Sequence, residues 1–158
     1  MSNLHPIKIL NILLLLFTIT SCNKVKTQFI SLDHMTFTNS YYKNSVRISY
    51  YVLIDNPAAT DKILKTEIIQ FVKNRLRNNR ALTEVNTASL NFVFYKKTNN
   101  TSYFIEHKED SGGLVSAEIS HFKDDYIATY YVSKCNGGII EKIYMYDRPE
   151  EVIKNGCK

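Results

Sequence analysis

The chain has 158 residues, of which 44% are apolar and 22% charged, with a formal net charge of +5. This composition is typical of a globular protein and excludes collagen and wholesale disorder. Five Gly and three Pro leave no room for a Gly-rich phosphate loop or a Pro-rich tail.

The first 21 residues are predicted to be a secretory signal peptide. One Lys and no acidic residue precede an apolar run of 11 residues, Ile9–Ile19. A bilayer-spanning helix needs about 20 apolar residues. A buried core helix is the alternative, but the run has no polar face. A basic segment, an apolar run and small residues favour a removable signal, which leaves 137 of the 158 residues, enough for one domain.

The end of this segment, Ile19-Thr20-Ser21-Cys22, resembles the lipobox of bacterial lipoproteins: an aliphatic residue, two small residues and a Cys. The resemblance ends at Cys22 and implies cleavage before it and acylation of Cys22, for example with palmitate. Acyl chains contribute about 0.8 kcal/mol per buried CH₂ and hold a protein firmly on a bilayer. Asn23, in place of Asp, implies the outer membrane of the bacterial envelope, with the domain facing the periplasm.

Two further cysteines, Cys135 and Cys157, form an even pair once Cys22 is acylated. In an oxidising envelope such a pair predicts a disulfide. It would close a loop of about 22 residues and stabilise the fold by about 3 kcal/mol. Two free thiols are the alternative. After processing, 19 basic and 15 acidic residues leave a net charge of +4, which does not imply a nucleic-acid partner.

The mature chain is expected to hold a tether and one α+β domain. Residues 22–40 are polar and mixed, which favours a lipidated tether that ends in a short strand near Phe29–Phe37. Residues 41–158 are expected to form the single domain. Alternating, β-branched residues predict its first strand over 46–54.

A main helix is predicted over 57–79, where the apolar residues have helical spacing. Asn56 can cap this helix, with Pro57 at its first position. Its end carries a basic cluster of Lys73, Arg75, Arg77 and Arg80. A solvated helix end explains this cluster, because cations favour the helix dipole there. An anion site or an acidic partner is the alternative.

After this helix the pattern predicts strands joined by hairpin turns. They are expected over 89–95, 102–107, 114–122, 126–134 and 138–146. A short C-terminal helix is predicted over 149–155. The predicted fold is therefore one main helix packed on a four- to six-stranded antiparallel meander sheet. Its element order resembles cystatin-like folds, a likeness that does not determine function.

Hairpin lengths predict which residues lie opposite one another: 94/104, 104/117, 117/130 and 130/143. One face of the sheet is then apolar and is expected to receive the helix. Its residues are Leu90, Phe92, Phe94, Phe104, Val115, Ala117, Ile119, Ala128, Tyr130, Val132, Ile143 and Met145.

The opposite face is the candidate partner-binding surface, because tyrosine offers both contact area and a hydroxyl. A solvated sheet back, or one covered by the N-terminal segment, is the alternative. One row across this face is predicted to hold Tyr95, Tyr103, Glu118, Thr129 and Tyr144. The candidate binding residues are Tyr95, Tyr103, Glu118, Tyr131, Lys142, Tyr144 and Tyr146.

Motifs for catalysis and metal binding are absent from the sequence, which has no HExxH and no G-x-S-x-G. His107 and His121 each precede two carboxylates, a group that a metal could use. The predicted strand places the two clusters at opposite ends, which favours polar turns over one metal site. We therefore expect no catalytic residue, no metal and no cofactor.

The expected function is non-catalytic binding: a membrane-anchored adaptor or subunit of an envelope assembly, for secretion or transport, with a protein partner. One alternative is a periplasmic immunity or inhibitor lipoprotein against a toxin or hydrolase. Another is a small-ligand-binding or enzymatic domain built on a cone-shaped sheet.

Overall fold

A computed structural model of the protein describes residues 26–41, 45–83, 87–109, 112–114, 116–146 and 148–158. Cys22 and the predicted signal peptide lie outside the described residues. In chain order the elements are β1 (Gln28–Tyr41), β2 (Ser45–Asp55), α2 (Asp61–Asn78), η2 (Ala81–Thr83), β3 (Thr87–Lys96), α3 (Tyr103–Glu106), α4 (Ser116–His121), η3 (Lys123–Asp125), β4 (Tyr126–Cys135), β5 (Gly138–Met145) and β6 (Glu151–Asn155).

The sheet is mixed, so the predicted antiparallel meander with cystatin-like element order is wrong. Its six strands lie in the order β1-β2-β3-β4-β5-β6, and β2 and β3 are parallel while the other neighbours are antiparallel. The physical reason is the helix between β2 and β3. A helix that crosses over the sheet brings the chain back to the end where β2 began. β3 therefore runs in the same direction as β2.

Two predicted strands, 102–107 and 114–122, are instead the short helices α3 and α4. The chain turns sharply after β3, because the buried Thr101 hydroxyl donates to the Lys96 carbonyl at 2.8 Å and accepts from the Thr98 amide at 2.8 Å. The chain therefore leaves the sheet at this point, and β3 pairs directly with β4.

The predicted register changes accordingly. Phe94 lies opposite Ala128, and Phe92 lies opposite Tyr130. The expected pairs 94/104, 104/117 and 117/130 are therefore wrong. The pair Tyr130/Ile143 is confirmed, because the tight turn between β4 and β5 is present. Gly137 adopts φ +77° in that turn, a conformation that glycine tolerates at little cost.

The C-terminal segment is also a strand rather than the predicted helix over 149–155. β6 pairs with β5, with Ile140 opposite Asn155. The predicted disulfide between Cys135 and Cys157 is present, with 5.6 Å between the Cα atoms, a usual separation for this bond. The bond joins the end of β4 to the residues after β6.

The main helix begins later than predicted. Thr60 is its N-cap, and the Thr60 hydroxyl accepts from the Ile63 amide at 3.4 Å. Asn56, the predicted cap, precedes the helix by several residues and has φ +50°. The buried residues Leu64, Ile68 and Val72 of α2 form the apolar stripe that the spacing predicts.

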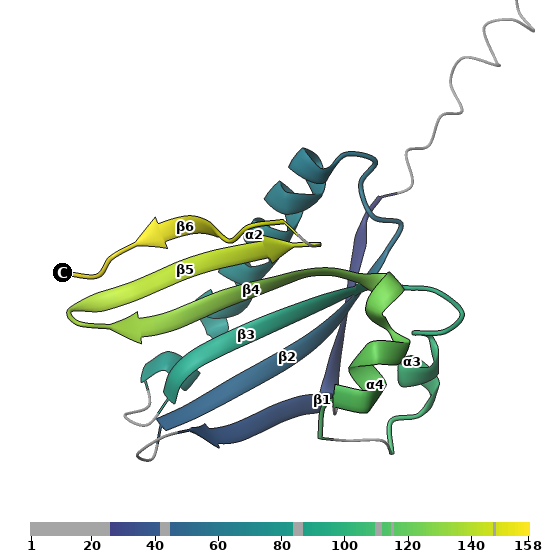
Figure 1. Ribbon diagram of the computed structural model, residues 1–158, viewed down its shortest axis with the longest axis horizontal. Coiled ribbons are helices and arrows are strands. Elements are labelled where there is room, and N and C mark those ends of the chain that lie inside the picture. Colours follow the sequence, from purple (N-terminus) through teal and green to yellow (C-terminus); the bar gives the residue numbers. More distant parts are fainter. Residues whose placement is uncertain (1–25, 42–44, 84–86, 110–111, 115, 147) are drawn as a thin grey trace, which may run out of the picture.

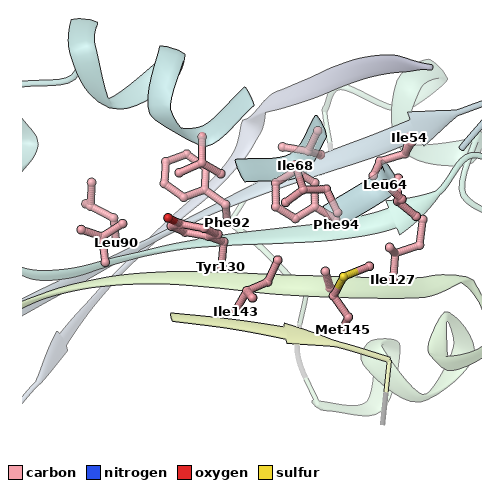
Figure 2. Packing of buried hydrophobic residues seen from close by; sticks show 14 residues of the cluster. Ile54, Leu64, Ile68, Leu90, Phe92, Phe94, Ile127, Tyr130, Ile143 and Met145 are labelled. Carbon is pink, nitrogen blue, oxygen red and sulfur yellow. The ribbon is translucent and has the colours of Figure 1, made fainter. Parts of the chain in front are cut away.

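The main core lies between α2 and one face of the sheet (Figure 2). Of the predicted apolar face it contains Leu90, Phe92, Phe94, Ala128, Tyr130, Val132, Ile143 and Met145. Phe104 packs elsewhere and Ile119 is 44% exposed, because neither belongs to a strand. Val115 and the side chain of Ala117 lie outside the described part.

A second, smaller core lies on the opposite face of the sheet, where α3 and α4 cover one end (Figure 1). Its buried residues are Leu32, Met35, Tyr51, Leu53, Tyr95 and Phe104. β1 contributes to both cores: the Phe29 ring stacks on Phe71 of α2 at 4.7 Å between centroids. β1 (Gln28–Tyr41) thus occupies most of the range 22–40, where a tether ending in a short strand near Phe29–Phe37 was expected.

Candidate partner-binding face

The candidate site is on the sheet face opposite α2, in the part formed by β4 and β5. Tyr131 lies opposite Lys142, and Thr129 lies opposite Tyr144. Because alternate residues of a strand point to opposite faces, these side chains point away from the core that holds Tyr130 and Ile143. The Tyr131 and Tyr144 rings pack edge to face, 5.5 Å apart.

An ion pair fixes the polar part of this site. Lys142 Nζ lies 2.6 Å from Glu150 Oε1, and the Tyr144 hydroxyl also donates to the Glu150 carboxylate. The hydrogen bonds from Lys142 and then Tyr144 lower the pKa of Glu150. The same bond to Glu150 is the main cause that raises the pKa of Tyr144. We call Tyr131, Lys142, Tyr144 and Glu150 the tyrosine cluster.

The lowered pKa of Glu150 gives a direct test of this geometry. Lys142→Gln is expected to raise that pKa toward the ordinary carboxyl range, because the cation that favours the carboxylate is lost. In the unsubstituted protein the pair stabilises the fold above the ordinary Glu pKa. That contribution is lost as the pH falls through the lowered folded value. Carboxyl-carbon NMR titration measures this shift, and Lys73→Gln on the exposed side of α2 is the control. An unchanged Glu150 titration in Lys142→Gln would contradict the cluster.

Three predicted partner residues lie apart from the tyrosine cluster, so the expected row across the sheet is wrong. Tyr95 is only 5% exposed, packs against Tyr126, and has a pKa raised mainly by burial. Tyr103 lies on α3 and is 45% exposed, and Glu118 is exposed on α4. The row fails because α3 and α4 are not strands.

Tyr146 also lies apart from the cluster. It follows the end of β5 with φ 52° and is 39% exposed. Its pKa is raised first by burial and then by the charge of Asp61, and is lowered in part by Arg148. The charges that act on its hydroxyl thus belong to Asp61, at the start of α2, and to Arg148, and not to the tyrosine cluster.

A cleft of about 530 Å³ lies over α3 and α4. Its lining includes Glu109 and His121, which belong to the two His-containing segments that the predicted strand placed at opposite ends. Carboxylates of Glu109 and Glu118 line it together with His121, Tyr103, Phe104 and Phe122. His107 Nδ1 lies 2.8 Å from Glu109 Oε1. The pKa of Glu109 is lowered, first by a hydrogen bond from its own backbone and then by His107. Among the described residues, no group of three or more His, Cys, Asp or Glu could hold a metal ion.

One cluster residue, Glu150, was missed from the sequence because it lies in the link between β5 and β6, in a segment where a short helix was predicted instead. The one feature of the sequence that could have indicated Glu150 is the acidic pair Glu150-Glu151. It follows a predicted strand whose Lys142 was expected on the open face. Within the described part of the chain, no helix combines the length and the apolar character needed to cross a membrane.

Comparisons of this chain with protein-family models, with curated proteins and with solved structures found no match. Its function is therefore inferred from its own residues and their geometry.

Proposed function

We propose that the protein is a lipid-anchored lipoprotein of the bacterial envelope whose domain binds a protein partner without catalysis. It would be an adaptor or subunit of an envelope assembly for secretion or transport. The observation that carries this proposal is the tyrosine cluster, which holds two paired tyrosines and an ion pair on a sheet face. In Figure 1, α3 and α4 lie at one end of that face and leave the middle of β4 and β5 uncovered.

The chemistry of the cluster suits a protein surface as its ligand. Tyrosine rings supply contact area at a small cost in conformational entropy, and their hydroxyls supply hydrogen bonds. The Tyr131 and Tyr144 rings are already packed on each other. Their side chains therefore lose little conformational freedom when a partner binds. Such aromatic residues are common among the few that dominate binding energies. The partner expected here offers apolar area together with hydrogen-bonding groups.

Anchoring is the second part of the proposal and is supported by the lipobox-like sequence before Cys22. Metabolic labelling with a fatty-acid analogue is expected to mark the protein and to leave the Cys22→Ser variant unmarked. An unmarked protein that fractionates with the cytosol would contradict the anchor and the envelope location together.

The binding part is tested by capture of a tagged protein from its own cells in mild detergent. Tyr131→Ala and Tyr144→Ala are each expected to weaken the captured complex by about 30-fold, the equivalent of a 2 kcal/mol hot spot. Tyr103→Ala is the matched control, since this tyrosine is exposed on α3 outside the cluster. The unfolding midpoints of all three variants are measured alongside the affinities.

The outcomes separate the possible functions. Undiminished capture by both cluster variants would contradict the tyrosine cluster, and loss with Tyr103→Ala alone would move the binding surface to the cleft over α3 and α4. A secretion or transport protein as the captured partner supports the adaptor function. A toxin or hydrolase as the partner would replace it with an immunity function.

A further inference from the structure

We infer that one defined end of the domain lies against the lipid bilayer: the start of β1, the β2–α2 loop and the first turn of α2. The strand registers define this end. Gln28 pairs with Asp55, Ile54 with Lys96, and Ala128 with Met145, so these residues share one end of the sheet. The Cys135–Cys157 disulfide lies at the other end. The inference rests on the proposed acylation of Cys22 and adds the orientation of the domain.

The reach of the chain sets the first constraint. The described structure begins at Lys26, four residues after the proposed anchor at Cys22. A fully extended chain advances at most about 3.6 Å per residue, so these four steps span about 14 Å or less. An acylated Cys22 lies at the bilayer surface. Lys26 and the side chains around it must therefore stay close to the lipid head groups.

The surface at this end has the apolar character of an interfacial contact. Lys26 lines an open groove of about 820 Å³ whose apolar residues are Pro57, Ala58, Ala59 and Ile63. Ile63 is 53% exposed although α2 has a well-formed buried stripe. A large aliphatic side chain beside small apolar ones can enter the head-group region of a bilayer, where burying its surface is favourable.

The charges at this end favour an anionic lipid surface. Lys26 and Lys62 are exposed, and neither takes part in an ion pair with the described part of the chain. Glu67 also lines the groove and carries a negative charge, which opposes binding to an anionic surface. The other two carboxylates here are neutralised by ion pairs, Asp55 with Lys97 at 2.9 Å and Asp61 with Arg148. Lysines near an anionic membrane are attracted to it, so Lys26 and Lys62 favour this contact.

This orientation has a consequence for the tyrosine cluster. Tyr144 is the penultimate residue of β5, at the end of the sheet that faces the lipid. A partner that binds Tyr144 would then approach along the membrane surface. The disulfide end of the domain, and the C-terminus beside it (Figure 1), would point away from the bilayer.

The test uses the mature, acylated protein in vesicles of phosphatidylethanolamine and phosphatidylglycerol. Two variants each carry one free thiol for a fluorescent label: Ile63→Cys at the proposed membrane end, and Ser40→Cys as the matched control. Ser40 is exposed near the far end of β1. The other cysteines are acylated or disulfide-bonded. A quencher attached to lipid head groups is expected to quench the label at 63 several-fold more strongly than the label at 40.

The charge contribution is tested with Lys26→Glu combined with Lys62→Glu, which is expected to reduce the quenching at 63. Lys73→Glu combined with Lys158→Glu, two exposed lysines away from the proposed membrane end, is the control of equal charge and should leave it unchanged. Equal quenching at 63 and 40 in protein shown by mass to be acylated would overturn the orientation alone, because the domain would then move freely on its anchor. Absence of the acyl mass would overturn the proposed anchor, and the orientation with it.

Discussion

Replacing Phe94 by Ala is expected to lower the free energy of unfolding by about 3–5 kcal/mol, the usual cost of removing a buried ring. Phe94 is 0% exposed and lies where three elements meet. Its ring packs edge to face against Phe29 of β1 and Phe71 of α2, at centroid distances of 6.2 and 5.9 Å. The cavity left by Ala would be bordered by rigid strands on one side and a helix on the other, so little collapse is expected.

This variant tests whether β1 is part of the folded domain rather than of the tether. Urea unfolding followed by circular dichroism gives the free energy, with Ile119→Ala as the control. Ile119 is 44% exposed on α4, so its truncation is expected to change stability by about 0.5 kcal/mol or less. If Phe94→Ala cost no more than this control, then Phe29 and Phe71 would not pack around Phe94.

The parts of the fold that the sequence predicts correctly are those with long, regular periods. The β-branched-rich segment 46–54, which begins with alternating residues, and the helical stripe of Leu64, Ile68 and Val72 each extend over several residues, so neighbouring residues reinforce one pattern. The face of the sheet that packs on α2 follows from the same alternation. It is found even though the strand order is wrong, because which face a residue occupies depends only on its own strand.

The segments that are predicted wrongly are short, and their structure is decided by distant contacts. Tyr103-Phe104-Ile105 has strand-forming residues, yet it forms one turn of helix because Phe104 packs into the second core against Phe122. At the C-terminus, Pro149 and Gly156 favour a short helix locally. Pairing of β6 with β5 and the disulfide override this preference.

The candidate site follows the same rule. Tyr131, Lys142 and Tyr144 are placed together correctly, because a tight turn fixes the register of β4 and β5. Tyr95 was expected on the open face and does point to that side of the sheet, but α3 covers it. No local pattern shows which part of a face a loop insertion will cover, so burial of Tyr95 could not be predicted from its strand.

Loss of the Cys135–Cys157 disulfide is expected to lower the free energy of unfolding by about 3 kcal/mol. The bond links residues 22 apart in the sequence, and without it the unfolded chain gains the freedom of that loop. Loss of the bond should also destabilise β6 locally. β6 has few buried side chains, since Val152 is 53% exposed and Ile153 only half-buried. The strand therefore depends on the bond for its place at the edge of the sheet.

Two measurements separate these effects in the Cys135→Ser, Cys157→Ser double variant. Urea unfolding reports the global loss, and amide hydrogen exchange reports local opening. Amides of β6 are expected to exchange much faster in the double variant, whereas those of β3 should follow only the global change, because Leu90, Phe92 and Phe94 are fully buried. Cys22→Ser, which leaves the bridge intact, is the control. Unchanged exchange in β6 would mean that its pairing with β5 alone holds the strand, and the bond would then act only on the unfolded chain.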